Sequence, residues 1–487
     1  MTASTLRYAE RGPGPGAAVA VLLLFGALAG VGIAIGEAQA MIGAVAAVAC
    51  LAALIDFRAG ALFLMVMLPI GAVSFFPHSM FGLTGLNPIN VLVATTLVSF
   101  LFRGKRLGIL TPRPLVLLYV LPIVIAGLIG SRHVDDIVSY FWENELLHFS
   151  DGIGYMRDMM LKPLVIVVAA LLIGAAVAQS KKPERFIAPI VIAVWLMSLT
   201  AIGFVLDSGV RLGELASTGG RAFFSSLGMH ANDLGRLYAV AYALLLFTWG
   251  ETKDRALKTV LVVTMGVLTI ALLLTFSRGA FIGFAMINGL FLLWKFNART
   301  AAIAVLVLAI GAMLLPGAVV GRMMLGFDGG GSMNTVSAGR VDDIWLPLIA
   351  SGDVTKSLLW GNGLDSIMWS DAAWAGTILL VGHPHNAYLQ AVLDMGVLGL
   401  CLLLAYFVHV WRGFRSLGSN AYLSPAMRGF FQGATAGLLC FLLTGFAGSS
   451  LRPTAEFAFL WIAIGMMYGV RARTPEKTAT GAAQPKL

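Results

Sequence analysis

Residues 163–179 read PLVIVVAALLIGAAVAQ, an apolar run that contains no charged side chain. A helix of about 17–25 such residues is long enough to cross the hydrocarbon core of a bilayer, which is about 30 Å thick. Runs of the same kind recur on both sides of it, from residue 17 to residue 470. The pattern therefore predicts an all-α polytopic membrane protein.

The composition of the whole chain agrees with this prediction. Of the 487 residues, 59% are hydrophobic and only 12% are charged, and the mean hydropathy is +0.88. Soluble domains carry about 25% charged residues, which they need to cover a surface in contact with water. The composition therefore excludes the soluble enzyme classes.

The net charge of +9 has an ordinary explanation in a membrane protein. In a soluble protein it would suggest nucleic acid, but here it is typical of basic residues that flank helices on the cytoplasmic side. We therefore expect no nucleic-acid partner. Cys50, Cys401 and Cys440 all lie inside apolar runs, which favours small core residues over a disulfide framework or a metal site.

Fourteen runs are apolar and long enough to span, so we expect about 12–14 transmembrane helices. Arg7 and Arg11 precede the first run, which is too long for the apolar part of a cleavable signal peptide and is expected to be a retained span. The predicted spans are 17–35, 38–56, 60–77, 86–102, 114–130, 163–179, 187–206, 231–249, 257–275, 279–295, 300–320, 387–410, 427–447 and 453–470.

The basic residues predict how these spans are oriented. With the N-terminal segment 1–16 in the cytoplasm, most of the 33 Lys and Arg residues fall on the cytoplasmic side, as the positive-inside rule requires. KKPER (181–185) and the tail 471–487 are then cytoplasmic, so both termini lie on that side. Three larger segments fall outside: 131–162, 207–230 and 321–386.

The longest outside segment, 321–386, lies between the eleventh and twelfth predicted spans and separates the N-terminal helices, 17–320, from the C-terminal helices, 387–470. Long loops are usually either functional or disordered. Four tryptophans favour an ordered loop because they give it apolar surface to bury, although tryptophans also rest at membrane interfaces. They are Trp345, Trp360, Trp369 and Trp374.

The positive-inside rule predicts few arginines outside, so those that lie there are candidates for function. Four of them sit close to predicted span ends: Arg221, Arg278, Arg340 and Arg452. Arg278 is the sharpest candidate, because it sits in a tight turn between two spans in LLLTFSRGAFIGF (272–284). Arginine suits bidentate phosphate binding, and a diphosphate at the outer membrane surface would suit this site. The alternative is an arginine that snorkels to the interface.

Arg221 and Arg340 have simpler explanations as well. Arg221 precedes a polar helix start near Asn232, and helix N-termini favour anions, but it could equally pair with Glu214 or Asp207. Arg340 could pair with one of the two aspartates that follow it in SAGRVDDIW (337–345). Both therefore remain candidates for binding a phosphate or a sugar.

The segment HPHNAYLQAVLDMGVLGL (383–400) opens a span directly after the largest loop. His385 stands at the mouth of that span, and histidine is the side chain best suited to act as a general base near neutral pH. His383 competes for the same role, and the alternative for either is a polar cap at the interface. Gly396 and Gly399 are small enough to let another helix approach closely.

Other chemistries have little support. The sequence contains no H-E-x-x-H, C-x-x-C, Walker A or G-x-S-x-G motif. The pairs Asp342–Asp343 and Asp365–Asp371 lack a recognisable metal-ligand spacing. We therefore expect neither a metal nor a cofactor.

With these segments in view, the chain resembles the O-antigen ligase and O-antigen polymerase superfamily of bacterial membrane glycosyltransferases. The strongest match is His385–Asn386, nine residues, then Gly396, two residues and Gly399. Three further segments resemble the family in the same order along the chain: GGRAFFSSLGMHANDLGRLYA (219–239), SRGA (277–280), and SAGRVDDIW (337–345) followed by WGNGLDSI (360–367). The resemblance covers residues 220–410, whereas residues 1–200 match only as hydrophobic spans.

The resemblance implies an enzyme of the bacterial inner membrane whose active site faces the periplasm. The donor would be an oligosaccharide on undecaprenyl diphosphate, and the acceptor a hydroxyl of a glycan or of the lipid A core. The reaction would be metal-independent and would invert the anomeric carbon. A flippase and a chain-length regulator are possible partners, besides the membrane lipids.

The resemblance also implies roles for individual residues. His385 would take the proton of the acceptor hydroxyl, with His383 as the alternative base. Arg278 and Arg221 would hold the diphosphate, and Arg340 would orient donor or acceptor. Asn386 would help to set the environment of the histidine.

Several functions remain open on the sequence. The motifs do not separate a polymerase from a ligase, and we favour a polymerase for O-antigen or exopolysaccharide. A transporter or flippase would need ionisable residues near the bilayer midplane, where Asp394 and Glu456 are the plausible acids. A structural subunit of an envelope complex would have no need of His385 at a span mouth.

Overall fold

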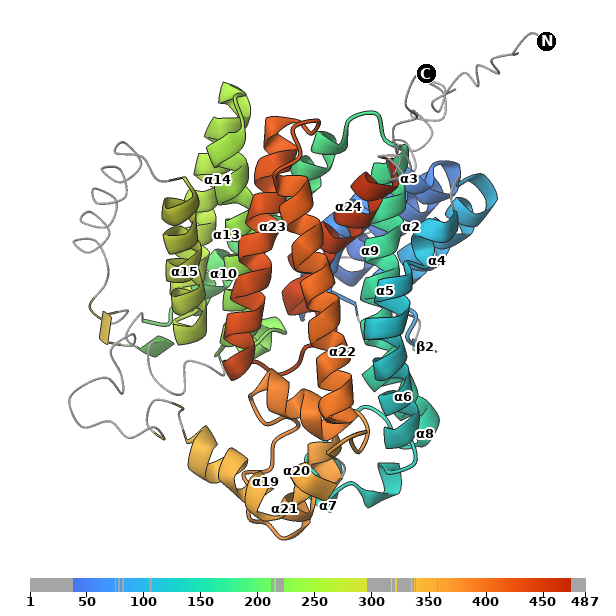
Figure 1. Ribbon diagram of the computed structural model, residues 1–487, viewed down its shortest axis with the longest axis vertical. Coiled ribbons are helices and arrows are strands. Elements are labelled where there is room, and N and C mark those ends of the chain that lie inside the picture. Colours follow the sequence, from blue (N-terminus) through green and yellow to red (C-terminus); the bar gives the residue numbers. More distant parts are fainter. Residues whose placement is uncertain are drawn as a thin grey trace, which may run out of the picture.

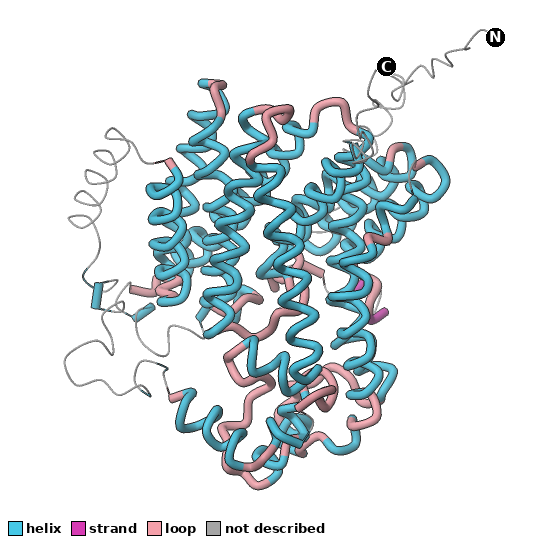
Figure 2. The backbone as a smooth tube through the Cα atoms, in the orientation of Figure 1, coloured by secondary structure: helices cyan, strands magenta, loops and turns pink. Residues whose placement is uncertain are grey.

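The computed structural model is built almost entirely of helices (Figure 1, Figure 2). The structure describes residues 38–74, 76–77, 79–80, 83–104, 107–211, 214–215, 223–295, 339–356 and 358–473, with Gly317, Val320, Gly321, Asn334 and Ser337. The predicted spans 17–35 and 300–320 therefore lie outside the described residues, apart from Gly317 and Val320. Each of the other predicted spans coincides with a helix.

The helices occur in the following order along the chain. The long ones are α2 (Ala38–Ile55), α3 (Phe57–Ile70), α4 (Pro88–Arg103), α5 and α6 (Arg113–Leu115 and Leu121–Gly130, in one helical segment), α8 and α9 (Gly152–Tyr155 and Lys162–Gln179, likewise continuous), α10 (Ile187–Ser208), α13 (Ala231–Glu251), α14 (Arg255–Leu274), α15 (Arg278–Trp294), α22 (Ala387–Gly418), α23 (Pro425–Thr444) and α24 (Ala458–Arg473). The short ones are α7 (Ser139–Glu143), α19 (Leu346–Ala350), α20 (Asp353–Lys356) and α21 (Asp371–Trp374). Strands β1 (Ser79–Met80) and β2 (Leu83–Thr84) pair in antiparallel fashion.

Seven helical segments in the described part of the chain are long and apolar enough to cross a membrane. They are Gly108–Gly130, Gly152–Gln179, Pro183–Ser208, Arg255–Leu274, Ala387–Gly418, Pro425–Ala447 and Ala455–Arg473. Shorter apolar helices include α3, α4 and α15. The protein is thus an all-α, multi-pass membrane protein, as the composition predicts.

Helix α13 forms the centre of the bundle. All its residues from Leu234 to Thr248 are buried, and it packs against α14, α15 and α23. Small residues allow the closest of these contacts, because a Cβ atom at Gly433 of α23 would collide with the carbonyl oxygen of Ala243. Without a hydrophobic driving force between helices in lipid, such close backbone contacts are a main source of packing energy.

Short helices and loops form a layer across one end of the bundle, seen at the bottom of Figure 1; we call this the loop end. It combines residues 131–151 with residues 339–386. The Val138 N–H donates to the carbonyl of Met368 (3.1 Å), and the Trp374 indole N–H donates to that of Asp136 (2.9 Å). The two segments therefore pack as one layer although they are far apart in the sequence.

The four tryptophans of the large loop divide into two pairs. Trp345 and Trp369 are partly buried in this layer, and the Trp345 indole N–H donates to the carbonyl of Pro384 (2.7 Å). Trp360 and Trp374 are instead 62% and 60% exposed. The described part of the loop is therefore ordered around two of its tryptophans and presents the other two at its surface.

Candidate functional site

A cavity of about 340 Å³ opens at the loop end, where the bundle meets the layer. Its volume lies near the lower end of the range of about 300–1,000 Å³ that is usual for small-molecule sites. Four segments line it: the start of α13 (His230, Asn232, Asp233 and Arg236), the stretch before α19 (Gly339, Arg340, Asp343 and Ile344), the stretch before α22 (Leu379, His383 and His385) and the residues after α23 (Ala447 and Ser449).

Three of the predicted site residues meet in this cavity. His383, His385 and Arg340 all line it, although Arg340 is separated from the histidines by most of the large loop. Arg278 does not line the cavity but is the first residue of α15. This helix begins beside the cavity, since the hydroxyl of Ser277 donates to Oδ1 of Asn232 (2.9 Å), which lines it. Arg221 lies outside the described residues.

The start of α22 fixes the two histidines. Asn386 is the N-cap of this helix, and its Oδ1 accepts hydrogen bonds from the backbone N–H groups of Tyr388 (3.1 Å) and Leu389 (3.2 Å). His385, one residue earlier, has a left-handed backbone with φ of +52°. Such a conformation is uncommon for a residue with a Cβ and often marks a functional position. Asn386 thus sets the course of the chain at His385 by capping the helix.

The rings of His383 and His385 lie edge to face, with 4.2 Å between their centroids and 80° between their planes. The backbone N–H of His385 donates to Nδ1 of His383 (3.3 Å). This bond assigns the ring proton of His383 to Nε2. Among the residues that the structure describes, none hydrogen-bonds to the His385 ring.

Both imidazoles are held in the neutral form. The pKa of His385 is lowered to about 2, mainly by burial; the positive charges of Arg340 and Arg236 act in the same direction, as would a proton on His383 or His230. Burial also lowers the pKa of His383, although there Asp365 and Asp233 act in the opposite direction. Each neutral imidazole carries a nitrogen lone pair, but the cations that lower its pKa also make it a weak base while no anion lies beside them. The same cations can bind an anion.

Arg236 is a site residue that the sequence analysis did not single out. Its side chain is only 6% exposed and pairs with Asp233, one turn earlier in α13, and with Glu456 Oε1 (3.4 Å). The hydroxyl of Ser449, on the cavity wall, also contacts Glu456 Oε1 (3.4 Å). The signal was present in the sequence, since Asp233 and Arg236 stand three residues apart at a polar helix start.

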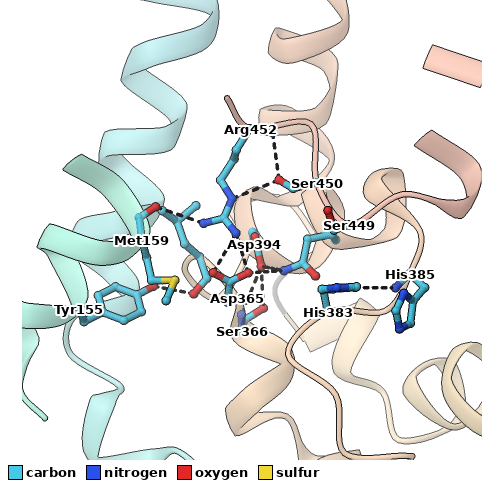
Figure 3. A network of polar contacts seen from close by, with 12 residues as sticks. Tyr155, Met159, Asp365, Ser366, His383, His385, Asp394, Ser449, Ser450 and Arg452 are labelled. Atoms are coloured by element: carbon cyan, nitrogen blue, oxygen red, sulfur yellow. Dashed lines mark hydrogen bonds and ion pairs between the residues drawn. The ribbon is translucent and has the colours of Figure 1, made fainter. Parts of the chain in front are cut away.

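A second polar network lies beside the cavity (Figure 3). Arg452 donates two hydrogen bonds to the carboxylate of Asp365, at 2.6 and 2.8 Å, and a third to the carbonyl of Met159 (3.2 Å). Gln390 Nε2 donates to Asp394 Oδ1 (2.6 Å), and the N–H of Ser366 donates to the same atom (3.2 Å).

Two aspartates that were considered as metal ligands are paired with basic residues. Asp365 pairs with Arg452, and Asp371 pairs with Lys356. The structure brings together no group of three or more His, Cys, Asp or Glu side chains that could hold a metal ion among the residues it describes.

Helix α22 is broken at Gly396, whose φ of +68° and ψ of −179° are accessible only to glycine. Residues 358–363 fill the break: the N–H groups of Asn362 and Gly363 donate to the carbonyls of Leu393 (2.8 Å) and Asp394 (3.0 Å). On the other side of the break, the Val397 N–H donates to the carbonyl of Leu358 (2.7 Å). We call this contact the α22 clasp.

The clasp corrects the sequence interpretation of the two glycines in α22. A Cβ atom at Gly396 would collide with the carbonyl oxygen of Leu359, so the partner of Gly396 is a loop and not a helix. A Cβ atom at Gly399 would meet the side chain of Met395, one turn earlier in the same helix. The expectation of a second helix at this face was therefore wrong, because helical periodicity does not reveal a break inside a helix.

The chain was also compared with known proteins. No protein-family model matches it, and no curated protein matches it. The functional argument therefore depends on the residues and on the geometry of this cavity.

Proposed function

We propose that the protein is a membrane glycosyltransferase that moves a glycan from undecaprenyl diphosphate to a sugar hydroxyl, without a metal and with inversion at the anomeric carbon. The observation that carries the proposal is the cavity at the loop end. There the neutral imidazoles of His383 and His385 and two arginines, from segments far apart in the sequence, line one space. Such a site can bind an anionic leaving group and deprotonate a hydroxyl in the same place.

His385 is the proposed base. Its ring has no hydrogen-bonding partner among the described residues, whereas Nδ1 of His383 already accepts the backbone N–H of His385. A base must be within hydrogen-bonding reach of the proton that it removes and must have a nitrogen available to accept it. The geometry therefore favours His385 over His383, a choice that the sequence left open.

Among the described residues, Arg340 and Arg236 are the arginines that line the cavity, and Arg278 begins α15 beside it. In the proposed complex they stabilise the diphosphate as its negative charge grows. A bound diphosphate would also offset the positive charges that lower the pKa of His385. Donor binding would thereby raise the basicity of His385 when the acceptor hydroxyl has to be deprotonated.

The proposed reaction forms and breaks one bond at the anomeric carbon. The acceptor oxygen attacks that carbon while His385 takes the hydroxyl proton. The bond from the anomeric carbon to the diphosphate oxygen breaks, and undecaprenyl diphosphate leaves with the electron pair. The leaving group is already good, so the protein contributes mainly position, a base and charge stabilisation.

The proposal places the loop end in the periplasm and both termini in the cytoplasm of a bacterial inner membrane, with about 12–14 spans. Its support is the distribution of basic residues. Lys181 and Lys182 lie between α9 and α10, and Arg412 and Arg415 lie near the end of α22. Helix α22 runs from the loop end to the opposite end of the bundle (Figure 1). Cytoplasmic ends of membrane helices carry such an excess of basic residues.

Polymerase remains the proposed reaction type, with O-antigen ligase as the alternative. No observation favours a transporter. Asp394 and Glu456, the acids on which a transport mechanism would depend, are engaged by Gln390 and Arg236 respectively. Both acids therefore have a local role in holding the site together.

The test uses purified protein in liposomes with an undecaprenyl-diphosphate oligosaccharide and EDTA, and products are resolved on a glycan gel. We expect a ladder from the wild-type protein and none from His385→Ala. His148→Ala is the matched control, because His148 is an exposed histidine of the loop end that does not line this cavity. A single shifted band that requires lipid A core would identify a ligase, and an undiminished ladder from His385→Ala would contradict the assignment of the base.

A further inference from the structure

Arg452 is one of the four outside arginines that sit close to predicted span ends, and the proposed reaction does not use it. It lies in the connection between α23 and α24, and its side chain is 11% exposed. Its partner Asp365 is 10% exposed and belongs to the large loop. An ion pair buried to this extent costs desolvation energy, so its presence calls for an explanation other than stability alone.

Arg452 joins three parts of the loop end. Besides Asp365, it contacts the carbonyl of Met159 in the segment that leads into α9, and its Nε donates to the hydroxyl of Ser450 (3.1 Å). The planar guanidinium serves these partners at once, which a lysine could not do. Arg452 therefore fixes the large loop relative to the bundle.

Asp365 stands where the large loop meets α22. Its backbone is left-handed, with φ of +59°, and it lies two residues after Gly363, the last residue of the α22 clasp. Its neighbour Ser366 donates to Asp394 of α22 from the backbone N–H (3.2 Å), and Gln390 Nε2 lies 3.5 Å from Asp365 Oδ1. The ion pair with Arg452 thus holds the turn that touches two successive turns of α22.

The first half of α22 carries the histidines. Asn386, Gln390 and Asp394 follow one another at intervals of four residues, so they share one face of the helix. The cap residue Asn386, at the N-terminal end of this face, directly follows His385. Gln390 and Asp394, one and two turns further along the helix, contact the turn at residues 365–366. Figure 3 shows His383 and His385 next to this network.

We propose that Arg452 and Asp365 are positioning residues, which hold the large loop on α22 in the register that places His383 and His385 opposite Arg340. Arg340 approaches the cavity from the far end of the same loop, so the register of the loop sets both sides of the cavity. The catalytic consequence rests on the proposed function, whereas the structural consequence does not.

The test compares four variants with the wild type: Arg452→Lys, Asp365→Asn, and the single change Arg452→Asp with its charge swap Arg452→Asp/Asp365→Arg. The matched control is Lys356→Met/Asp371→Asn, which removes an exposed ion pair of the same layer whose side chains make no hydrogen bond to α22 among the described residues. Arg452→Lys keeps the charge but loses the fork that binds Asp365 and Met159 together, so it tests the geometry in a folded protein.

The first readouts need no substrate. Hydrogen exchange is expected to increase at residues 358–366 and at the start of α22 in Arg452→Lys and Asp365→Asn, and to stay unchanged in the control. Histidine NMR should show a lower pKa for His383 in Asp365→Asn, because the carboxylate of Asp365 opposes the effect of burial on that pKa. The charge swap should recover part of the protection that Arg452→Asp loses.

The second readout is the transfer assay. A catalytic group displaced by about 1 Å can cost about 10²-fold in rate, so kcat should fall by that order in Arg452→Lys while KM for the donor changes little. Unchanged exchange and unchanged histidine titration in Arg452→Lys and Asp365→Asn would overturn the positioning role. If the variants show altered hydrogen exchange but the wild-type protein itself transfers no glycan, the proposed function is overturned and the positioning role stands.

Discussion

The backbone N–H of His385 donates to the Nδ1 atom of His383, 3.3 Å away, and their rings lie 4.2 Å apart at 80°. This contact gives different roles to two histidines that are equivalent in the sequence pattern. His383 uses one ring nitrogen to hold the backbone of His385, and the ring of His385 faces the cavity. The predictions below follow from this division and from the elements that support it.

The first prediction concerns the titration of His385. Its pKa lies at about 2, mainly because of burial, and the positive charges of Arg340 and Arg236 act in the same direction. It should therefore stay neutral throughout the range of about pH 5–8 in which histidines normally titrate. NMR of protein labelled in histidine, with the His385→Ala spectrum for assignment, measures this. A His385 resonance that titrates near 6.5 would contradict it.

The lowered pKa of His385 also makes the stability of the folded protein depend on pH. Because the pKa of His385 is lower in the folded protein than in the unfolded chain, the unfolded chain binds the proton more tightly. The contribution of His385 to stability is therefore present above about pH 6.5 and is lost as the pH falls below that value. Added inorganic pyrophosphate should raise the pKa of His385, because it offsets the charges of Arg340 and Arg236.

The second prediction separates the capping role of Asn386 from a chemical role. Asn386→Ala removes the cap of α22 and should cost about 0.5–2 kcal/mol of stability. Asn386→Ser and Asn386→Asp should restore most of this stability, because both side chains cap helices well. Thermal unfolding in detergent measures the effect. If transfer follows stability across the three variants, Asn386 acts as a cap; loss of transfer in a stable Asn386→Ser would instead assign it a direct contact with substrate.

The third prediction concerns the break in α22. Gly396→Ala forces a Cβ into a backbone conformation that costs about 1–3 kcal/mol and into the carbonyl oxygen of Leu359. The matched control is Gly266→Ala in α14, where a Cβ would meet nothing within 4 Å. That change should raise stability, since alanine is favoured over glycine in a helix by about 1 kcal/mol. Equal effects of the two changes would contradict the clasp.

Much of this fold could be predicted from hydropathy alone. Apolar runs such as 163–179 coincide with helices because a membrane helix satisfies its own backbone hydrogen bonds, so its signal is local in the sequence. The same reasoning found the mouth of α22, since His385 and Asn386 directly precede an apolar run. Local patterns thus located the helices and one wall of the cavity.

The rest depends on contacts between distant segments, which have no local signature. Arg236 was missed because its partner Glu456 lies just before α24, more than two hundred residues away in the sequence. Asp365 was considered only as part of an aspartate pair without a metal-ligand spacing, because its partner Arg452, 87 residues away, could not be inferred from the local sequence. Gly396 resembled a helix-packing residue, because an apolar run looks the same whether or not the helix inside it is broken.

The fourth prediction contrasts the two arginines of the cavity. Arg236→Met leaves the carboxylate of Glu456, whose side chain is 7% exposed, without its cationic partner. The change should cost about 3–5 kcal/mol of stability, because an unpaired buried charge remains. Arg236→Met/Glu456→Gln removes that charge and should recover a large part of the loss. Arg340→Met should cost much less, because the Arg340 side chain is only partly buried.

Binding should show the opposite order of effects. Arg340→Met is expected to weaken binding of inorganic pyrophosphate, measured by calorimetry, while the stability of the protein is nearly retained. The stabilised Arg236→Met/Glu456→Gln should bind pyrophosphate nearly as well as the wild type if Arg236 serves mainly to neutralise its two acids. If that double variant loses binding as well, Arg236 contacts the anion directly, and the cavity holds the phosphate between the start of α13 and the large loop.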